Sequence, residues 1–391
     1  MKIVVAPDKF KGSLTASQAA AAIAAGLRAG LPGADVVTIP VADGGEGTVD
    51  AAVAAGFRRV PVTARGPTGE PVRASYARRG DAAVVELACV CGLPRLPGGR
   101  REPLAASSFG AGEVLRAALD AGARRVVLAA GGSASTDGGA GLLQALGARV
   151  LDKRGRPMGP ALGGGAALHG AASLDLAGLH PALRSCSLVI ATDVANPLTG
   201  PDGAAAVFGP QKGASPAQVG ELASGLSHWA EVVTAATGTD WSRAPGAGAA
   251  GGVGFAALAV LGARRRPGID VVLELAGFDK ALAGAALVIT GEGSLDAQSL
   301  AGKAPVGVAR AAARAGIPVV AVAGRTTLTR RQLAVAGIAA IHTLSELEPD
   351  PARSSAEAGP LLARVGRLIA CGPFAPTATL RAAASPRRSR S

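Results

Sequence analysis

Five apolar segments of strand length each end in a polar or glycine-rich loop. In open parallel sheets, ligands bind beyond the carboxyl ends of the strands, so this recurrence constrains both the fold and the position of a site. It is the strongest signal in the chain that needs no relative for comparison. In chain order the loops carry Asp8 and Lys9, Asp43 and Glu46, Ser133 and Asp137, Asp193 and Asn196, and Glu292 and Asp296.

Strand-like and helix-like segments alternate at both ends of the chain. Residues 2–6, 17–31 and 36–41 predict strand, helix and strand, and residues 285–323 repeat the pattern. Such alternation is typical of a parallel sheet. Residues 58–87 instead predict short strands with turn glycines between them, which is more typical of hairpins.

The length of 391 residues also favours two domains, because a single core usually divides below this size. We expect an α/β fold with a parallel-sheet domain made from residues 1–63 and 284–372. A second α/β domain, residues 64–283, is expected to be inserted into it. Residues 373–391 hold four arginines and no acid, and predict a disordered basic tail.

Composition argues against several other classes of protein. The chain is 49% hydrophobic, yet the nearest candidate for a membrane span, the uncharged residues 246–263, is almost entirely Gly and Ala in its first half. The amino terminus lacks the long apolar region of a secretory signal, so we expect a cytoplasmic protein without membrane association. Four cysteines and four histidines show no disulfide or zinc spacing.

The net charge of +12 raises nucleic acid as a partner. However, the basic residues are spread along the chain, and two Trp and one Tyr offer few surfaces on which bases could stack. We therefore expect no nucleic-acid partner. A steep salt dependence of DNA binding would support the opposite interpretation.

The longest glycine-rich loop, residues 131–141, follows a strand-like segment and opens a helix. Backbone N–H groups at such a turn can hold phosphate oxygens, assisted by the helix dipole. A tight turn that uses glycine for its backbone angles is the alternative. Two standard phosphate motifs fail: residues 246–251 fit G-x-G-x-x-G without a preceding strand, and Gly302-Lys303 lacks the rest of a Walker sequence.

The loop acids suit two tasks in phosphoryl transfer. A few carboxylates can hold Mg²⁺ together with phosphate oxygens and water, and one carboxylate can accept a proton from a hydroxyl. Each acid taken singly is explained as well by a helix cap. Lys9, Lys212 and Lys303 are candidates to neutralise phosphate charge, with a solvated surface position as the alternative for each.

Longer motifs resemble the bacterial glycerate kinases of the first type. They occur in the family's order over about residues 1–345. Lys9 stands where many relatives carry Ser, so we expect no catalytic role for it, and the cysteines of residues 87–93 are expected to pack. The motifs are APDKFKGSL from Ala6, PVADGGEGT from Pro40, GGSASTDGGAG from Gly131, DVANPL from Asp193, VFGPQKGA from Val207, GAGAAGG from Gly246, TGEGSLD from Thr290 and GKAP from Gly302.

This resemblance implies ATP-dependent phosphorylation of D-glycerate, usually to 2-phosphoglycerate. It also implies a flavodoxin-like domain built from both chain ends, an inserted α/β domain, and a site in the cleft between them. Alternatives are a 3-phosphoglycerate product, another small hydroxy acid as substrate, and a regulatory protein that only binds phosphate or nucleotide. ATP and Mg²⁺ are the implied cofactors, and a homodimer is left open.

The resemblance also suggests roles for individual residues, although the sequence does not decide among the acids. The candidate catalytic residues are Asp193, Asp43 and Asp8. Glycerate is expected to contact Lys11, Gly44, Gly45 and Glu46. The phosphates of ATP are expected near Gly131, Gly132, Ser133, Ser135, Asp137 and Lys303. Asp193 is expected to hold Mg²⁺ together with Glu292 or Asp296.

Overall fold

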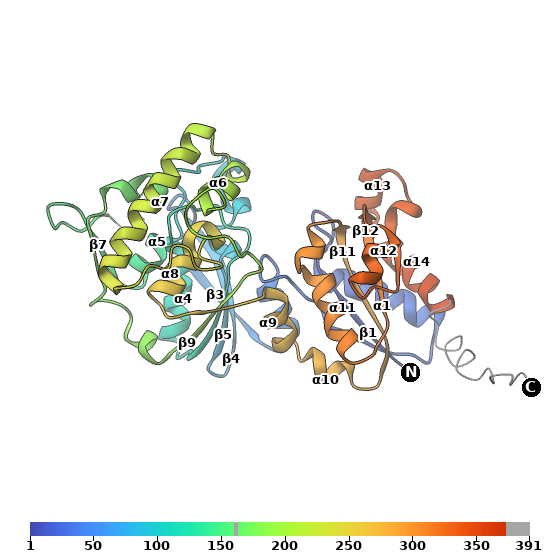
Figure 1. Ribbon diagram of the computed structural model, residues 1–391. Coiled ribbons are helices and arrows are strands. Elements are labelled where there is room, and N and C mark those ends of the chain that lie inside the picture. Colours follow the sequence, from blue (N-terminus) through green and yellow to red (C-terminus); the bar gives the residue numbers. More distant parts are fainter. Residues whose placement is uncertain (160–162, 373–391) are drawn as a thin grey trace, which may run out of the picture. The chain divides into compact units, whose positions relative to one another are not determined.

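The computed structural model of the chain describes residues 1–159 and 163–372 and divides into two compact units (Figure 1). Unit 1 contains Met1–Ala42 and Val272–Ser391, the latter described to residue 372, and unit 2 contains Asp43–Val271. One unit thus comes from both chain ends and the other is inserted into it. No helix in these described ranges is long and apolar enough to cross a bilayer.

Unit 1 is built on five parallel strands: β1 (Lys2–Pro7), β2 (Asp35–Thr38), β11 (Ala285–Leu295), β12 (Val319–Thr326) and β13 (Ala340–Thr343). Their order in the sheet is β2-β1-β11-β12-β13. Numbered within the unit this is 2-1-3-4-5, the order of flavodoxin-like sheets. The predicted parallel sheet from both chain ends is confirmed.

The helices of unit 1 are α1 (Ala16–Gly30), α10 (Phe278–Leu282), α11 (Ala304–Arg314), α12 (Arg330–Val335), α13 (Pro351–Ala356) and α14 (Ala358–Cys371), with 3-10 turns η7 (Ser299–Ala301) and η8 (Leu344–Glu346). Alternation along β1 explains how helices cover the sheet. Ile3 and Val5 pack with α1 and α14 in one apolar core, so Val4 between them points to the other face of the sheet. Helix α11 packs against β11, β12 and β1 (Figure 1).

Unit 2 contains a mixed six-stranded sheet in the order β10 (Arg264–Arg266), β9 (Ser187–Ala191), β6 (Arg125–Ala129), β5 (Ala82–Glu86), β4 (Pro71–Arg79) and β3 (Arg58–Arg65). The first four strands are parallel, and β4 is antiparallel to both β5 and β3. Hairpins over residues 58–87 are therefore confirmed. A separate ribbon pairs β7 (Arg149–Leu151) with β8 (Ser173–Asp175).

The helices of unit 2 are α2 (Thr48–Ala54), α3 (Ala88–Cys91), α4 (Phe109–Asp120), α5 (Ala140–Ala145), α6 (Ala204–Phe208), α7 (Pro216–Thr237) and α8 (Val253–Ala259), and α9 (Gly268–Leu275) begins in unit 2 and ends in unit 1. Its 3-10 turns are η1 (Leu93–Arg95), η2 (Pro97–Gly99), η3 (Gly165–Gly170), η4 (Pro181–Ser185), η5 (Pro210–Lys212) and η6 (Ala249–Gly252). Trp229 of α7 is fully buried in the core of this unit. Its indole N–H donates to the carbonyl of Gly138 at 3.1 Å, so α7 holds the buried side of the glycine-rich loop in place.

The boundaries between the units differ from the expected positions after residues 63 and 283. The first lies before Asp43, since the backbone N–H of Val49 in α2 donates to Glu86 at the end of β5, at 2.9 Å. The second follows Val271, since the N–H of Gly268 donates to Asp193 after β9. These bonds join residues far apart in the sequence, which a local pattern does not reveal. The predicted basic tail, residues 373–391, lies outside the described residues.

Candidate active site

Unit 2 gathers several predicted residues at the carboxyl edge of its parallel strands. Residues following β6, β9 and β10 lie side by side there, because these strands are parallel neighbours in register. The loop of residues 43–47 packs closely against the same edge. The N–H of Gly131 donates to the carbonyl of Gly44 at 3.3 Å.

Two glycines allow this close approach. A Cβ atom on Gly44, whose φ is +85°, would lie 2.7 Å from the Cα of Gly268. A Cβ atom on Gly131 would lie 2.5 Å from the Cα of Gly45. Any larger residue would push the loop off the sheet edge, so the contact between residues 43–47 and the 131–137 turn depends on glycine.

Two neighbouring acids affect the ionisation of Asp193 at this edge. Asp193 Oδ1 accepts the N–H of Gly268 at 2.9 Å, and Asp43 Oδ1 accepts the N–H of Gly45 at 3.1 Å. Partial burial, with a smaller contribution from the negative charges of Asp43 and Asp270, raises the pKa of Asp193 to about 6, against the opposing effects of the Gly268 N–H and the positive charge of Arg265. A carboxyl with such a pKa can exchange a proton near neutral pH.

The predicted phosphate turn has an accessible tip and a buried base. Gly132 is exposed and Gly131 partly so, whereas Ser133 and Ser135 are buried with their hydroxyls 3.0 Å apart. Backbone groups of the two glycines are therefore the accessible part of the turn. The two serine hydroxyls form hydrogen bonds inside the turn, since the hydroxyl of Ser133 also accepts the N–H of Ser135 at 3.1 Å.

Asp137 has a different environment from the one we predicted. It is fully buried, and its carboxylate accepts the N–H and the hydroxyl of Ser108 at 2.7 and 2.9 Å. It also accepts the N–H groups of Gly139 and Gly141 at 3.2 and 3.4 Å. Burial raises the pKa of Asp137, and these donors oppose the rise. The carboxylate thus binds the amino-terminal ends of α4 and α5, where helix dipoles favour a negative charge.

Glu86 was missing from the predicted site. It is buried at the end of β5, and its bond to the N–H of Val49 fixes the start of α2 just after the Asp43 loop. Burial is the main cause that raises the pKa of Glu86. The apolar run of residues 82–85 followed by an acid is the same signal that marked the other five loops, so this residue could have been found from the sequence.

Unit 1 carries the remaining predicted residues at its own carboxyl edge. Its topological switch point lies between β1 and β11, where ligands bind in sheets of this order. The N–H of Asp8 donates to Gly291 at 2.8 Å, and Asp8 Oδ1 accepts the N–H of Lys9 at 2.6 Å. Glu292 follows Gly291 in β11 and accepts a hydrogen bond from the hydroxyl of Ser299. Asp8 and Glu292 thus flank this switch point.

Three further predicted residues lie nearby in the chain of unit 1. Asp296 accepts the N–H of Gln298 at 2.9 Å and stabilises the turn that begins η7. Lys303 is the N-cap residue of α11 and is partly exposed, and Lys11 is exposed in the loop after β1. Unit 1 therefore holds Asp8, Lys11, Glu292, Asp296 and Lys303, and unit 2 holds the other predicted residues.

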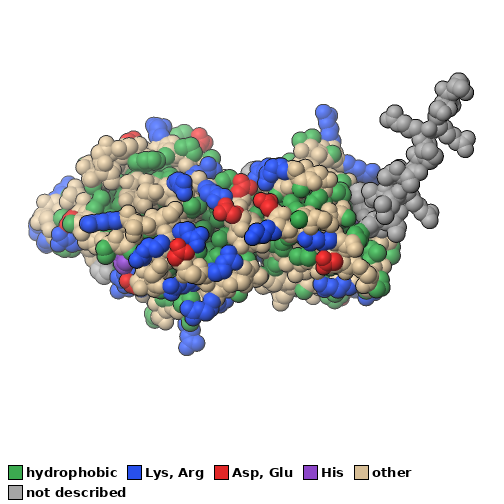
Figure 2. Space-filling model, turned by 90° about the horizontal axis from the view of Figure 1, so that it is seen from below, with side chains coloured by type: hydrophobic (Ala, Val, Ile, Leu, Met, Phe, Trp, Pro, Cys, Tyr) green, Lys and Arg blue, Asp and Glu red, His purple; other side chains and the backbone are tan. Residues whose placement is uncertain are grey.

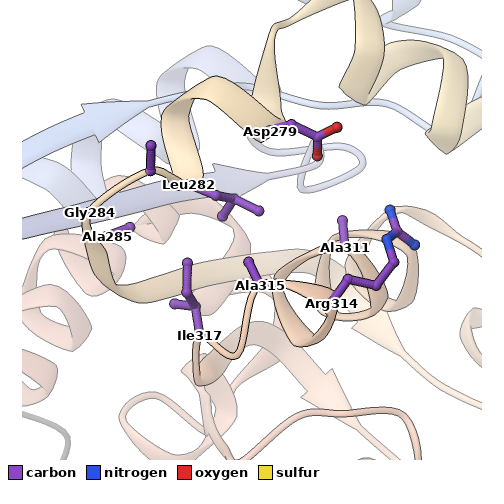
Figure 3. A pocket seen from close by; sticks show the side chains of 9 residues that line it. Asp279, Leu282, Gly284, Ala285, Ala311, Arg314, Ala315 and Ile317 are labelled. Atoms are coloured by element: carbon purple, nitrogen blue, oxygen red, sulfur yellow. The ribbon is translucent and has the colours of Figure 1, made fainter.

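A cavity of about 520 Å³ lies elsewhere in unit 1 (Figure 3). It adjoins the amino-terminal end of β11 and is bordered by Asp279, Leu282, Arg314 and Ile317. This is the opposite end of β11 from Glu292. A ligand of an open parallel sheet is expected at the carboxyl end, so we do not place the active site in this cavity.

Surface charge is mixed. Lys and Arg side chains are scattered over the face shown in Figure 2, with acidic and apolar side chains among them. Several arginines of unit 2 form ion pairs with carboxylates: Arg59 with Asp50, Arg125 with Asp81, Arg149 with Asp175 and Arg156 with Asp152. Within residues 1–159 and 163–372, no three His, Cys, Asp or Glu side chains form a cluster that could hold a metal ion.

The chain is a two-unit α/β protein. One unit has acids at the switch point of a flavodoxin-like sheet, and the other has acids beside a glycine-rich turn. This combination suits phosphoryl transfer. A model of the glycerate kinase family matches residues 3–371. The chain belongs to this family and is a phosphotransferase.

Named relatives agree along most of the chain. The "Glycerate kinase" of Bacillus subtilis (strain 168) is 47% identical over 347 residues, which is 88% of this chain and 90% of the relative. The "Glycerate 2-kinase" of Escherichia coli (strain K12) is 47% identical over 332 residues, 84% of this chain and 86% of the relative. The crystal structure of a putative glycerate kinase 2 from Salmonella typhimurium LT2 is similar, with a TM-score of 0.82 and 42% identity, covering 98% of this chain and 99% of that one.

Proposed function

We propose that the protein transfers the terminal phosphoryl group of ATP to the 2-hydroxyl of D-glycerate, giving 2-phosphoglycerate and ADP. The observation that carries this proposal is similarity to glycerate kinases along nearly the whole chain. The choice of the 2-hydroxyl is supported by the relative named "Glycerate 2-kinase", at 47% identity. A 3-phosphoglycerate product and a different small hydroxy acid are the alternatives.

Asp193 is the residue we propose as general base. One of its oxygens accepts the N–H of Gly268, which orients the carboxylate. With a pKa of about 6 it is mostly ionised at pH 7.5, yet it is more basic than an ordinary aspartate. Both properties favour acceptance of a proton as the hydroxyl attacks phosphorus.

The accessible glycines of the 131–137 turn are proposed to contact the phosphates of ATP. Gly132 is exposed with φ of +76°, a conformation in which backbone N–H groups can line an anion site. Phosphoryl transfer needs mainly positioning and charge neutralisation, which such a turn provides. The side chains of Ser135 and Asp137 would act through the shape of the turn, since neither is exposed.

Two carboxylates at this edge could serve a divalent cation whose other ligands would be phosphate oxygens and water. After burial, the negative charges of Asp43 and Asp270 contribute to the raised pKa of Asp193, and a cation would offset this effect. Asp43 and Asp193 would hold Mg²⁺, which neutralises charge on the transferred phosphate. Roles for Asp8, Lys11, Glu292, Asp296 and Lys303 stay predictions, to be tested by single substitutions.

The test is incubation of the purified protein with D-glycerate, ATP and Mg²⁺, followed by phosphorus NMR. A 2-phosphoglycerate signal supports the full proposal, whereas a 3-phosphoglycerate signal keeps the kinase and overturns the choice of hydroxyl. Intact ATP with a folded protein would refute glycerate as the substrate.

Asp43→Asn and Asp193→Asn distinguish loss of a cation ligand from loss of the base. Asp43→Asn would lose a ligand alone, so its activity should recover in part at high Mg²⁺ concentration. Asp193→Asn would lose the base as well as a ligand, so its activity should not recover under the same conditions.

A further inference from the structure

Lys212 is a buried cation that the proposed chemistry has not used. It is the last residue of η5, and only 3% of its surface is exposed. Its ammonium donates to the carbonyl of Ser135 at 2.5 Å and to the hydroxyl of Thr136 at 3.4 Å. Both acceptors belong to the base of the 131–137 turn, so Lys212 lies beneath the turn and not on its accessible side.

The charge of Lys212 is poorly balanced. Within the described ranges its ammonium forms no ion pair, and both of its hydrogen-bond acceptors are neutral. Burial lowers the pKa of Lys212 to about 8, and the neighbouring charge of Asp137 only partly opposes this. Asp137 is itself engaged by Ser108 and by the amino terminus of α5.

The other elements around Lys212 supply little charge. The neighbouring α6 has the sequence AAAVF and carries no titratable side chain. The guanidinium of Arg101 donates to the carbonyl of Gln211, on the exposed side of η5. A methionine would fill this space without the cost of burying a charge, so packing does not account for lysine here.

A chain of contacts links the ammonium to the accessible tip of the turn. The carbonyl of Ser135 accepts hydrogen bonds from Lys212 and also from the hydroxyl of Ser133, at 3.2 Å. Ser133 directly follows the exposed Gly132. The contacts thus connect the tip to a positive charge that water screens only weakly, because the ammonium is buried.

We propose that Lys212 is a positioning residue for nucleotide: its buried ammonium fixes the base of the 131–137 turn and supplies the positive charge that favours ATP phosphate at the tip. The inference rests on the proposed function, because ATP is taken as the anion. It predicts linkage: ATP binds best when Lys212 is protonated, and ATP binding in turn makes Lys212 retain its proton.

The experiment compares the wild type with Lys212→Met, which has similar volume and no charge, and with Lys153→Met as a control at an exposed lysine of the same unit. Steady-state kinetics from pH 7 to 9.5 should show the wild-type KM for ATP rising by up to tenfold per pH unit above about pH 8. In Lys212→Met that KM should be at least tenfold higher at pH 7 and independent of pH. The KM for glycerate should change little, and Lys153→Met should match the wild type.

Calorimetry provides a second measurement that does not depend on the variant. Titration of the wild type with Mg-ATP at pH 8.5, in two buffers of different ionisation enthalpy, should show uptake of up to one proton per ATP bound. Absence of proton uptake would overturn the proposal, even if Lys212→Met failed to fold. Unchanged kinetics in a folded Lys212→Met would also overturn it.

The two proposals can fail separately. Proton uptake that is lost in Lys212→Met, in a protein that does not phosphorylate glycerate, would support the role of Lys212 and refute the proposed function. A wild-type protein that phosphorylates glycerate but takes up no proton with ATP would support the proposed function and refute the role of Lys212.

Discussion

Substitution of Asp193 by Asn should inactivate the protein and at the same time stabilise unit 2. The ordinary pKa of an aspartate is 3.8, and in the folded chain the pKa of Asp193 is about 6. At 1.36 kcal/mol per pKa unit, this difference corresponds to about 3 kcal/mol of destabilisation once the carboxyl is ionised. Asp193 is partly exposed, and water screens part of the effect, so we expect about 1–3 kcal/mol.

The sign fixes the pH window. The folded state binds the proton of Asp193 more tightly than the unfolded state. The free energy of unfolding therefore falls as the pH rises from about 4 to about 6. Above pH 6 the loss is complete. Asn carries no proton and still accepts the N–H of Gly268, so the stability difference between Asp193→Asn and wild type should open over this window and then stay constant.

Tryptophan fluorescence gives a direct assay. Both tryptophans of the chain, Trp229 and Trp241, lie in unit 2, so urea unfolding followed by their emission reports on this unit. Free energies of unfolding should be compared at pH 4.5, 6 and 7.5. The control is Asp202→Asn, at an exposed aspartate of the same unit, which should show no such difference.

Turnover of Asp193→Asn should fall by at least about 100-fold, the usual contribution of a general base. A variant that is inactive and less stable than wild type at pH 7.5 would refute the electrostatic reasoning. So would a stability difference that is equal at pH 4.5 and 7.5. Normal turnover would remove Asp193 from the mechanism.

Three further outcomes are expected in unit 2. Gly44→Ala should lose about 1–3 kcal/mol more than Gly200→Ala in urea unfolding, because both residues have positive φ but only Gly44 has backbone within 3 Å of the new methyl group; equal losses would contradict this. Asp137→Ala should cost about 3–5 kcal/mol or prevent folding, measured by the same fluorescence, since it leaves several buried donors without an acceptor. Mg²⁺ without nucleotide should raise the urea midpoint of wild type but not of Asp193→Asn, with NaCl of equal ionic strength as control. An equal rise in both proteins would refute a cation at Asp193.

The sequence predicts the strands of unit 1 well because each signal is local. An apolar run bounded by glycine or proline places a strand at residues 2–6, and β1 covers Lys2–Pro7. A helix is predicted from Ser215 with Pro216 at its first position, and α7 begins there with a capping box between Ser215 and Gln218. Local rules of patterning and capping are sufficient for such elements.

The domain boundaries and the depth of the site residues are not local properties. The change of pattern at residue 58 suggested a boundary near residue 63, but one hydrogen bond from Val49 to Glu86 attaches α2 to the unit 2 sheet. Likewise, Asp137 and Gly132 lie in one glycine-rich motif, yet the first is fully buried and the second is exposed. The motif located the turn, and only the packing of α4 and α5 against it decides which groups face outward.

Burial is therefore a poor guide to function here unless the partners of each charge are counted. Asp137 and Asp193 both have a pKa raised by burial, but Asp137 accepts five hydrogen bonds from the surrounding chain. Asp193 accepts one, and the positive charge of Arg265 does not outweigh its burial and the two neighbouring acids. Lys212 resembles Asp193 in this respect, since its charge meets only neutral oxygens. A fold that needed these side chains for stability would have paired them, so the incompletely paired charges are where ligand binding should be tested first.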